Sequence, residues 1–313
     1  MRIASILLLA AGAGAVVWYF TPPASGTPAQ LKVERTEARV ARGHYLFSLA
    51  ACNSCHLARD FSHFAGPPLD PAQHPEAPHA PNLTADPQTG LGRWTDAEIV
   101  RAIREGIGRD GKPLDPAMPY QLYRQLSDED VFALTAYIRT LSPVACPLAR
   151  AAAGLTSLLQ RRAGVQAVPH VEKVDPNDRV RYGEYLATAA RCIDCHTRPD
   201  GGNMGAGGRI FHIPGAVVAS ANLTPSASAG IGRWSEQDFL DRFLQYRSYA
   251  EKGAPAVGPE GFTVMPWLEL SQLAPDDLRA IFAYLRTLPP SSAEVTTHPV
   301  NDKATLMRLR KNF

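Results

Sequence analysis

Two stretches of the chain carry apolar residues at every third or fourth position, the spacing that places side chains on one face of a helix. The residues on these faces are Val131, Leu134, Tyr137, Ile138 and Leu141 in the first, and Leu278, Ile281, Tyr284, Leu285 and Leu288 in the second. Ser127 precedes the first stretch as a helix cap, and Pro275 opens the second. Each stretch stops before a proline, so the pattern predicts two amphipathic helices.

Further helix signals precede these stretches. The segments Gly43–Ala51 and Gly183–Ala190 each predict a helix. The spacings Thr95-x-x-Glu98 and Ser235-x-x-Asp238 are capping boxes, which start helices. The intervening segments are rich in Gly and Pro and predict loops. The pattern as a whole predicts an all-α chain.

These elements belong to an internal repeat. The pentapeptide Cys52–His56 recurs as Cys192–His196, 140 positions later, and an Asn-Leu-Thr run at 82–84 recurs at the same offset. Beyond a repeated Gly-Arg-Trp the offset rises to 147, as it does between Met118 and Met265. The chain is therefore a tandem duplication, with seven extra residues in the second copy between the tryptophan and the methionine.

The repeated pentapeptide has the spacing Cys-x-x-Cys-His. This spacing places two thiols on one helical turn, where each can add to a haem vinyl group, and offers the next imidazole to the iron. A bare Cys-x-x-Cys is also a redox disulfide motif, and Cys and His also bind zinc. Zinc needs four protein donors, and neither copy has a second Cys or His pair at finger spacing. The motif predicts two covalently bound haems c, attached at Cys52, Cys55, Cys192 and Cys195, with His56 and His196 on iron.

The methionines limit the choice of the second axial ligand. Met118 lies 62 residues after His56, Met265 lies 69 after His196, and each precedes a proline and an aromatic residue. Met204 follows its motif by only eight residues, too few to reach the opposite haem face, so it is expected to pack in the protein. The other histidines have no partner in the repeat. Met118 and Met265 are therefore the predicted distal ligands.

The N-terminus predicts export. Eighteen uncharged residues, Ile3–Phe20, follow Arg2, a length at the lower end of what spans a membrane as a helix. A cleaved secretory signal is the alternative, but cleavage near Ala11–Ala15 would leave an exposed apolar stub. The favoured interpretation is an inner-membrane anchor with the haem domains in the periplasm. The fifth cysteine, Cys146, is expected to be a small buried side chain, although a reactive thiol stays possible.

Composition adds two limits. With 45% hydrophobic residues among 313, the chain can bury two cores of ordinary domain size. A formal net charge of only +2 and the lack of basic runs interleaved with aromatic residues give no support for nucleic-acid binding.

Together, the motifs Cys-x-x-Cys-His, Asn-Leu-Thr, Gly-Arg-Trp, Met-Pro-aromatic and Tyr-[Ile/Leu]-Arg-Thr-Leu resemble those of class I cytochrome c domains. The resemblance is to the cytochrome subunits of bacterial membrane-bound alcohol, aldehyde and gluconate dehydrogenases. It implies the following organisation: an anchor or signal segment, 1–22; a linker, 23–35; a first cytochrome c domain, 36–143; a linker, 144–176; a second domain, 177–290; and a tail, 291–313.

The predicted function is electron transfer without catalysis. Electrons would come from a membrane-associated dehydrogenase or a quinol-linked donor and pass to an oxidase or a small soluble carrier. The larger members of the group have three haem domains, so this resemblance leaves the partner open. The alternative is an enzyme, a dihaem peroxidase, which needs one iron that is open or reversibly bound by histidine. The paired Met-Pro sequences argue against it.

Overall fold

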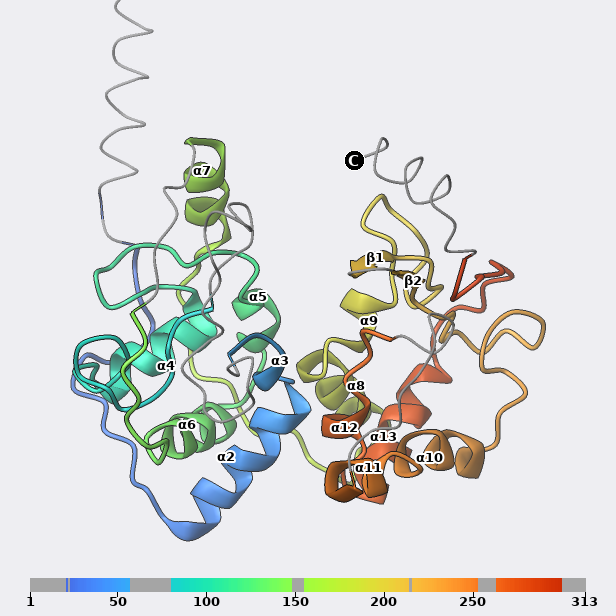
Figure 1. Cartoon of the computed structure of the whole chain (residues 1–313), viewed down its shortest axis with the longest axis horizontal. Coiled ribbons are helices and arrows are strands. Elements are labelled where there is room, and N and C mark those ends of the chain that lie inside the picture. The colour runs from blue at the N-terminus through green and yellow to red at the C-terminus, as the bar shows by residue number, and fades with distance from the viewer. Residues whose placement is uncertain are drawn as a thin grey trace, which may run out of the picture. The chain divides into compact units, whose positions relative to one another are not determined.

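The computed structural model describes residues 21, 23–56, 80–147, 155–213, 216–252 and 263–299. The chain divides into two compact units, Met1–Leu46 with Cys52–Lys173, and Phe47–Ala51 with Val174–Phe313 (Figure 1). No helix in the described ranges is long and apolar enough to cross a membrane. The predicted anchor at 1–22 lies outside the described residues except for Thr21.

Both units are built mainly from helices. The helices of the first half are α2 (Glu37–Leu49), α3 (Asn53–His56), α4 (Asp96–Glu105), α5 (Tyr120–Tyr123), α6 (Asp128–Ile138) and α7 (Leu155–Gly164). The elements of the second half are α8 (Arg179–Ala189), α9 (Cys192–Cys195), β1 (Ile210–Ile213), β2 (Ala216–Ala219), α10 (Glu236–Leu244), α11 (Arg247–Lys252), α12 (Trp267–Leu270) and α13 (Pro275–Leu285). The helices predicted from apolar spacing and caps are therefore confirmed as α2, α4, α6, α8, α10 and α13.

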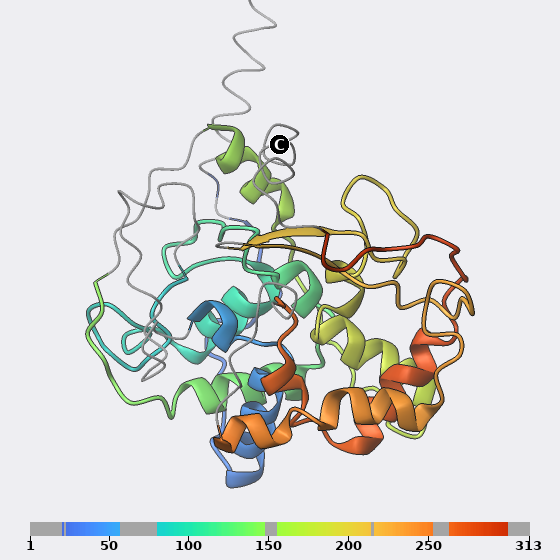
Figure 2. The ribbon, with the colours of Figure 1, turned by 45° about the vertical axis from the view of Figure 1, so that its right-hand side comes forward.

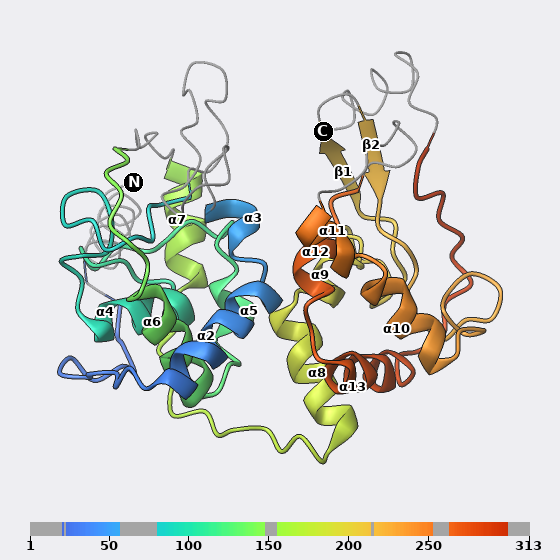
Figure 3. The ribbon, with the colours of Figure 1, turned by 60° about the horizontal axis from the view of Figure 1, so that its bottom comes forward.

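Each unit is organised around a close crossing of two long helices, α2 with α6 in the first and α8 with α13 in the second. A Cβ atom on Gly43 of α2 would lie 1.9 Å from the carbonyl oxygen of Ala133 of α6. A Cβ atom on Gly183 of α8 would lie 1.9 Å from the carbonyl oxygen of Ala280 of α13. Figure 3 shows α8 and α13 side by side. Only glycine permits the two backbones to approach so closely at these positions.

The capping boxes form as predicted. Thr95 Oγ1 accepts a hydrogen bond from the backbone N–H of Glu98 at 3.2 Å, and the Glu98 carboxylate accepts one from Thr95 N–H at 2.7 Å. Ser235 and Asp238 make the same exchange at the start of α10. These hydrogen bonds fix the residue at which each helix begins. They therefore also fix which side chains fall on its buried face.

The prediction of an all-α chain is wrong in one place. Strands β1 and β2 pair antiparallel in the second unit, with Ile210 opposite Ala219 and Ile213 opposite Ala216 (Figure 2). Val217 and Val218 are both buried, and such β-branched residues favour a pleated surface. Each strand is only four residues long, too short to give a clear alternating pattern in a Gly-rich region.

The second copy is seven residues longer than the first between the repeated tryptophan and the repeated methionine, and this interval contains α11. This helix follows α10 directly, whereas in the first unit the chain passes from α4 through a turn, with a bridge between Ile107 and Pro113, towards Met118. Residues 253–262, which complete the connection to Met265, lie outside the described ranges.

Part of the segment between the copies packs onto the first unit. Residues 164–171, here named the strap, begin at the last residue of α7. Arg124 donates to the carbonyl of Gly164 at 2.8 Å, Arg104 donates to that of Pro169 at 3.0 Å, and the N–H of Asp128 donates to that of Val171 at 3.0 Å. Backbone contacts of this kind make the strap a structural part of the first unit.

Candidate functional site

Each Cys-x-x-Cys-His motif forms a single helical turn. The N–H of His56 donates to the carbonyl of Cys52 at 3.0 Å, and that of His196 donates to Cys192 at 2.9 Å. The residue before the first cysteine has left-handed backbone angles in both copies: Ala51 has φ 49° and Arg191 has φ 61°. This conformation is uncommon outside glycine, and it separates the preceding long helix from the motif turn. Two thiols and one imidazole thus come from one turn in each unit.

The thiols of the motifs are not arranged for disulfide exchange. All five cysteines are described, and none is paired in a disulfide. Burial, followed by the neighbouring motif thiol, raises the pKa of Cys52 to about 12 and that of Cys192 to about 12. A redox-active Cys-x-x-Cys needs a thiol whose pKa is lowered, because the thiolate is the nucleophile. Reduced, unpaired thiols on one turn suit thioether attachment instead.

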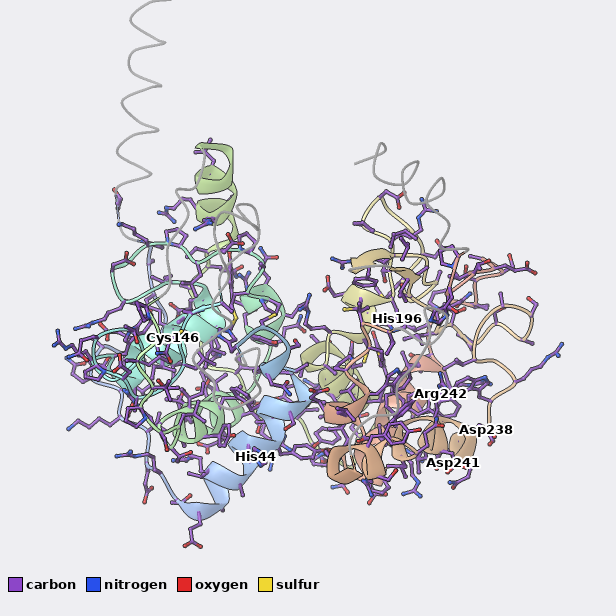
Figure 4. The ribbon with its side chains drawn as sticks, viewed as in Figure 1. His44, Cys146, His196, Asp238, Asp241 and Arg242 are labelled. Atoms are coloured by element: carbon purple, nitrogen blue, oxygen red, sulfur yellow. The ribbon has the colours of Figure 1, made fainter. Side chains whose placement is uncertain are left out.

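The imidazoles of His56 and His196 are both buried, at 6% and 9% exposure. His56 Nδ1 lies 2.8 Å from the carbonyl oxygen of Pro81, and His196 Nδ1 lies 2.7 Å from that of Ala221. His196 is labelled in Figure 4. Burial lowers the pKa of both rings, and the carbonyl bonds oppose this only in part. A carbonyl only accepts hydrogen bonds, so Nδ1 carries the proton of the neutral ring and Nε2 keeps its lone pair for a metal.

A buried asparagine holds each accepting carbonyl in place. Asn222 follows Ala221, and its Oδ1 accepts from the N–H of Thr224 at 2.9 Å and from the Thr224 hydroxyl at 2.7 Å. Its Nδ2 donates to the carbonyls of Ser291 at 2.9 Å and Ala293 at 3.0 Å. The loop that carries the carbonyl is therefore tied to a second, distant loop.

The first unit repeats this asparagine clamp. Asn82 Oδ1 accepts from the N–H and the hydroxyl of Thr84 at 2.9 and 2.7 Å, and its Nδ2 donates to the carbonyl of Val144 at 2.7 Å. Both asparagines begin the repeated Asn-Leu-Thr run, whose role in the structure was not predicted. Its recurrence at the same offset as the haem motif was the signal that could have linked the two.

A pair of repeated arginines completes the loop framework. Arg139, which follows α6, donates to the carbonyls of Leu91 at 3.1 Å and of Trp94, and to the Asp96 carboxylate at 2.8 Å. Arg286, after α13, donates to the carbonyl of Gly232 at 2.8 Å. The guanidinium thus holds the Gly-Arg-Trp loop against α6 in the first unit and α13 in the second, a role that was not predicted from the sequence.

Met118 and Met265 occupy equivalent positions. The carbonyl of each accepts a hydrogen bond from the N–H two residues later, that of Tyr120 or Trp267, at 2.8 Å. The intervening prolines have similar angles, with φ −81° and ψ 46° at Pro119 and φ −77° and ψ 65° at Pro266. A short helix then begins in both units, so the two methionines share one local backbone structure.

Two expectations for sulfur-containing residues are wrong. Met204 is 52% exposed and therefore does not pack in the protein. It lies in a turn that continues into Gly205, whose φ is +72°, and this turn leaves the side chain at the surface. Cys146 is half-buried rather than buried. Its N–H donates to the hydroxyl of Thr89 at 3.0 Å.

The chain is similar to known proteins in both of its halves. A family model described as Cytochrome c matches the chain twice, at residues 40–142 and 180–289. The fructose dehydrogenase cytochrome subunit of Gluconobacter japonicus is 34% identical over 267 residues, 80% of this chain and 52% of that protein. The alcohol dehydrogenase (quinone) cytochrome c subunit of Gluconobacter oxydans is 30% identical over 274 residues, 81% of this chain and 55% of that protein.

A third relative matches along nearly its whole length. The diheme cytochrome c-type protein of Cereibacter sphaeroides is 28% identical over 294 residues, which are 88% of this chain and 94% of that protein. By contrast, the chain spans about half the length of the two dehydrogenase subunits.

Replacing Asn222 with alanine should weaken the second histidine site. The Thr224 N–H and hydroxyl and the carbonyls of Ser291 and Ala293 would lose their hydrogen bonds to Asn222, so we expect the free energy of unfolding to fall by about 1–3 kcal/mol. Hydrogen exchange at the Thr224 amide, measured by mass spectrometry or NMR, should become faster. The control is Asn203→Ala, because Asn203 is exposed in the same unit. Unchanged exchange at Thr224 in Asn222→Ala would contradict the role assigned to the clamp.

Proposed function

Because this chain belongs to the cytochrome c family, with one cytochrome c domain matched in each half and two covalently bound haems c, we propose that it is an electron-transfer protein. The observation that carries the proposal is the imidazole whose Nδ1 bonds to a backbone carbonyl, found at His56 and again at His196. In each case this bond leaves Nε2 as the metal-binding atom.

The residues of the first unit would hold one haem. Cys52 and Cys55 would form the thioether bonds, His56 would be the proximal ligand, and Met118 would be the distal ligand. Two free thiols and an imidazole whose Nδ1 is hydrogen-bonded, all on one turn, support the first three roles. The backbone that Met118 shares with Met265 supports the fourth.

The residues of the second unit would hold the other haem in the same manner. Cys192 and Cys195 would attach it, and His196 and Met265 would be the axial ligands. Haem held in this way exchanges one electron between ferric and ferrous iron, and a thioether ligand favours the ferrous form. With His and Met at both axial positions, neither site would have room for a substrate at iron. The protein's task would be to hold the ligands still while electrons pass.

The proposed donor is the catalytic subunit of a dehydrogenase. Two of the relatives are named as cytochrome subunits of fructose and alcohol dehydrogenases, which supports this choice. The proposed acceptor is an oxidase or a small soluble carrier. Residues 1–22 would anchor the chain to the inner membrane with both haem domains in the periplasm, or would be removed to release a periplasmic form.

The dihaem peroxidase alternative receives less support. It requires an iron that can open to peroxide, and the equivalent placement of Met118 and Met265 disfavours such a vacancy. The three relatives described above carry names of cytochromes or dehydrogenase subunits.

Removing either predicted sulfur ligand should change one haem only. In Met118→Ala or Met265→Ala, the reduction potential of the affected haem should fall, because the ferrous form loses its thioether. The ferrous iron should also bind carbon monoxide through the open position. A redox titration and carbon monoxide difference spectra of the purified holoprotein measure both effects.

Met204→Ala is the matched control, because this third methionine is exposed. Its potentials and spectra should equal those of the unmodified protein. Spectra unchanged in either Met118→Ala or Met265→Ala would remove that methionine as a ligand.

The partner proposal has a separate test. The full-length chain, isolated from detergent-solubilised membranes, should copurify with a dehydrogenase catalytic subunit identified by mass spectrometry. Addition of that dehydrogenase's substrate to the complex should reduce both haems. Turnover of hydrogen peroxide by the purified holoprotein would instead favour the peroxidase alternative.

A further inference from the structure

The two copies differ in charge beside the residue that follows each Met-Pro. In the first unit this residue is Tyr120, whose side chain is fully buried. Gly106, at the end of α4, lies against the ring, because a Cβ atom there would be 2.5 Å from two ring carbons. Tyr120 N–H in turn donates to the carbonyl of Met118. Short contacts therefore join the end of α4 to the segment from Met118 to Tyr120.

Glu105, the last residue of α4, is completely buried at this point. Its Oε1 accepts from the N–H of Gly26 at 2.9 Å, and from the N–H and the hydroxyl of Thr27 at 3.1 and 3.0 Å. Its Oε2 is buried and has no hydrogen-bond partner among the described residues. The carboxylate is thus held only by neutral groups.

No cation in the described ranges neutralises Glu105 by an ion pair. The nearest along the chain, Arg104, is engaged by the Asp128 carboxylate and the carbonyl of Pro169. The N–H groups of Gly26 and Thr27 and the Thr27 hydroxyl converge on Oε1, and hydrogen bonds of this kind stabilise the ionised form of a carboxylate. Such a charge acts strongly on its surroundings, because little water screens it.

The second unit has the opposite arrangement. Its counterpart of Glu105 is Gln245, which is neutral and exposed. The counterpart of Tyr120 is Trp267, and the Arg242 guanidinium lies over its ring, with Cζ 4.9 Å from the ring centroid. Arg242 is labelled in Figure 4. Tyr246 stacks on the same indole at a centroid distance of 4.8 Å. In the first copy the position of Arg242 is held by Ala102. Trp267 N–H donates to the carbonyl of Met265. A positive charge therefore lies beside the segment from Met265 to Trp267.

We propose that Glu105 lowers the reduction potential of the first haem, that Arg242 raises that of the second, and that electrons consequently move from the first unit to the second. The proposal rests on the function proposed above. Ferric haem carries one more positive charge than ferrous haem, so a nearby negative charge favours the ferric form and a positive charge favours the ferrous form. In the transfer, one iron loses an electron and the other gains it. No bond is broken, and no proton has to move.

The two charges should respond differently to salt. Glu105 is buried, whereas Arg242 lies on an exposed face of α10. Mobile ions screen exposed charges much more than buried ones. The contribution of Glu105 should therefore persist as ionic strength rises, and that of Arg242 should decrease.

The test is a spectroelectrochemical titration of the dihaem protein carrying Glu105→Gln. The first potential should rise enough to change electron exchange between the haems about tenfold, or about 59 mV for a one-electron couple. The second potential should not move. Met118→Ala and Met265→Ala assign the two waves to their haems. Asp110→Asn is the matched control, because it removes the same charge from a side chain that is 50% exposed, and it should shift neither potential.

Arg242→Gln tests the second charge, and it provides the test of the proposal if Glu105→Gln does not fold. It should lower only the second potential, and less so at high salt. The proposal would be overturned if these variants fold, keep both haems with their His/Met spectra, and show unchanged potentials. That result would leave the proposed function intact. Loss of the His/Met spectra in the unmodified protein would instead refute the function on which it rests.

Discussion

The hydrogen bond from a histidine Nδ1 to a backbone carbonyl is the interaction on which the rest of each unit depends. It fixes the orientation of a buried ring and decides which nitrogen can bind a metal. The accepting carbonyls, those of Pro81 and Ala221, lie 25 residues from their histidines. The fold must therefore bring a distant loop to each motif turn. The asparagine clamp and the arginine after the last helix restrain that loop, and the glycine crossing positions the helices that carry them.

The duplication shows which parts of this framework are shared and which have diverged. The motif turn, the clamp, the guanidinium contacts and the backbone at the methionines recur with nearly the same distances. The surroundings of the residue after Met-Pro do not. In the first unit Tyr120 is buried near the strap and the Glu105 carboxylate. In the second unit Trp267 is surrounded by α11, Tyr246 and Arg242. Two sites built alike can thus differ in electrostatics, which is what directional electron transfer requires.

Much of this organisation could be predicted from the sequence because its signals are local. Capping boxes, apolar stripes and the Cys-x-x-Cys-His spacing act within a few residues, and their repetition strengthened each prediction. The hairpin β1–β2 was missed because its strands are short and lie among glycines. Met204 was misplaced because a count of residues from the motif excludes ligation without showing where the side chain lies. The Asn222 clamp joins positions 69 and 71 residues apart, and no sequence pattern indicates such pairings.

The most direct test of the account is NMR of the ferrous dihaem protein with ¹⁵N-labelled histidine. It predicts two buried rings with Nδ1 protonated and hydrogen-bonded, slow to exchange with water, and with Nε2 bound to iron. His56→Ala and His196→Ala would each remove one of the two signals. A spectrum in which either ring binds iron through Nδ1, or in which only one ring is bound to iron, would contradict the account.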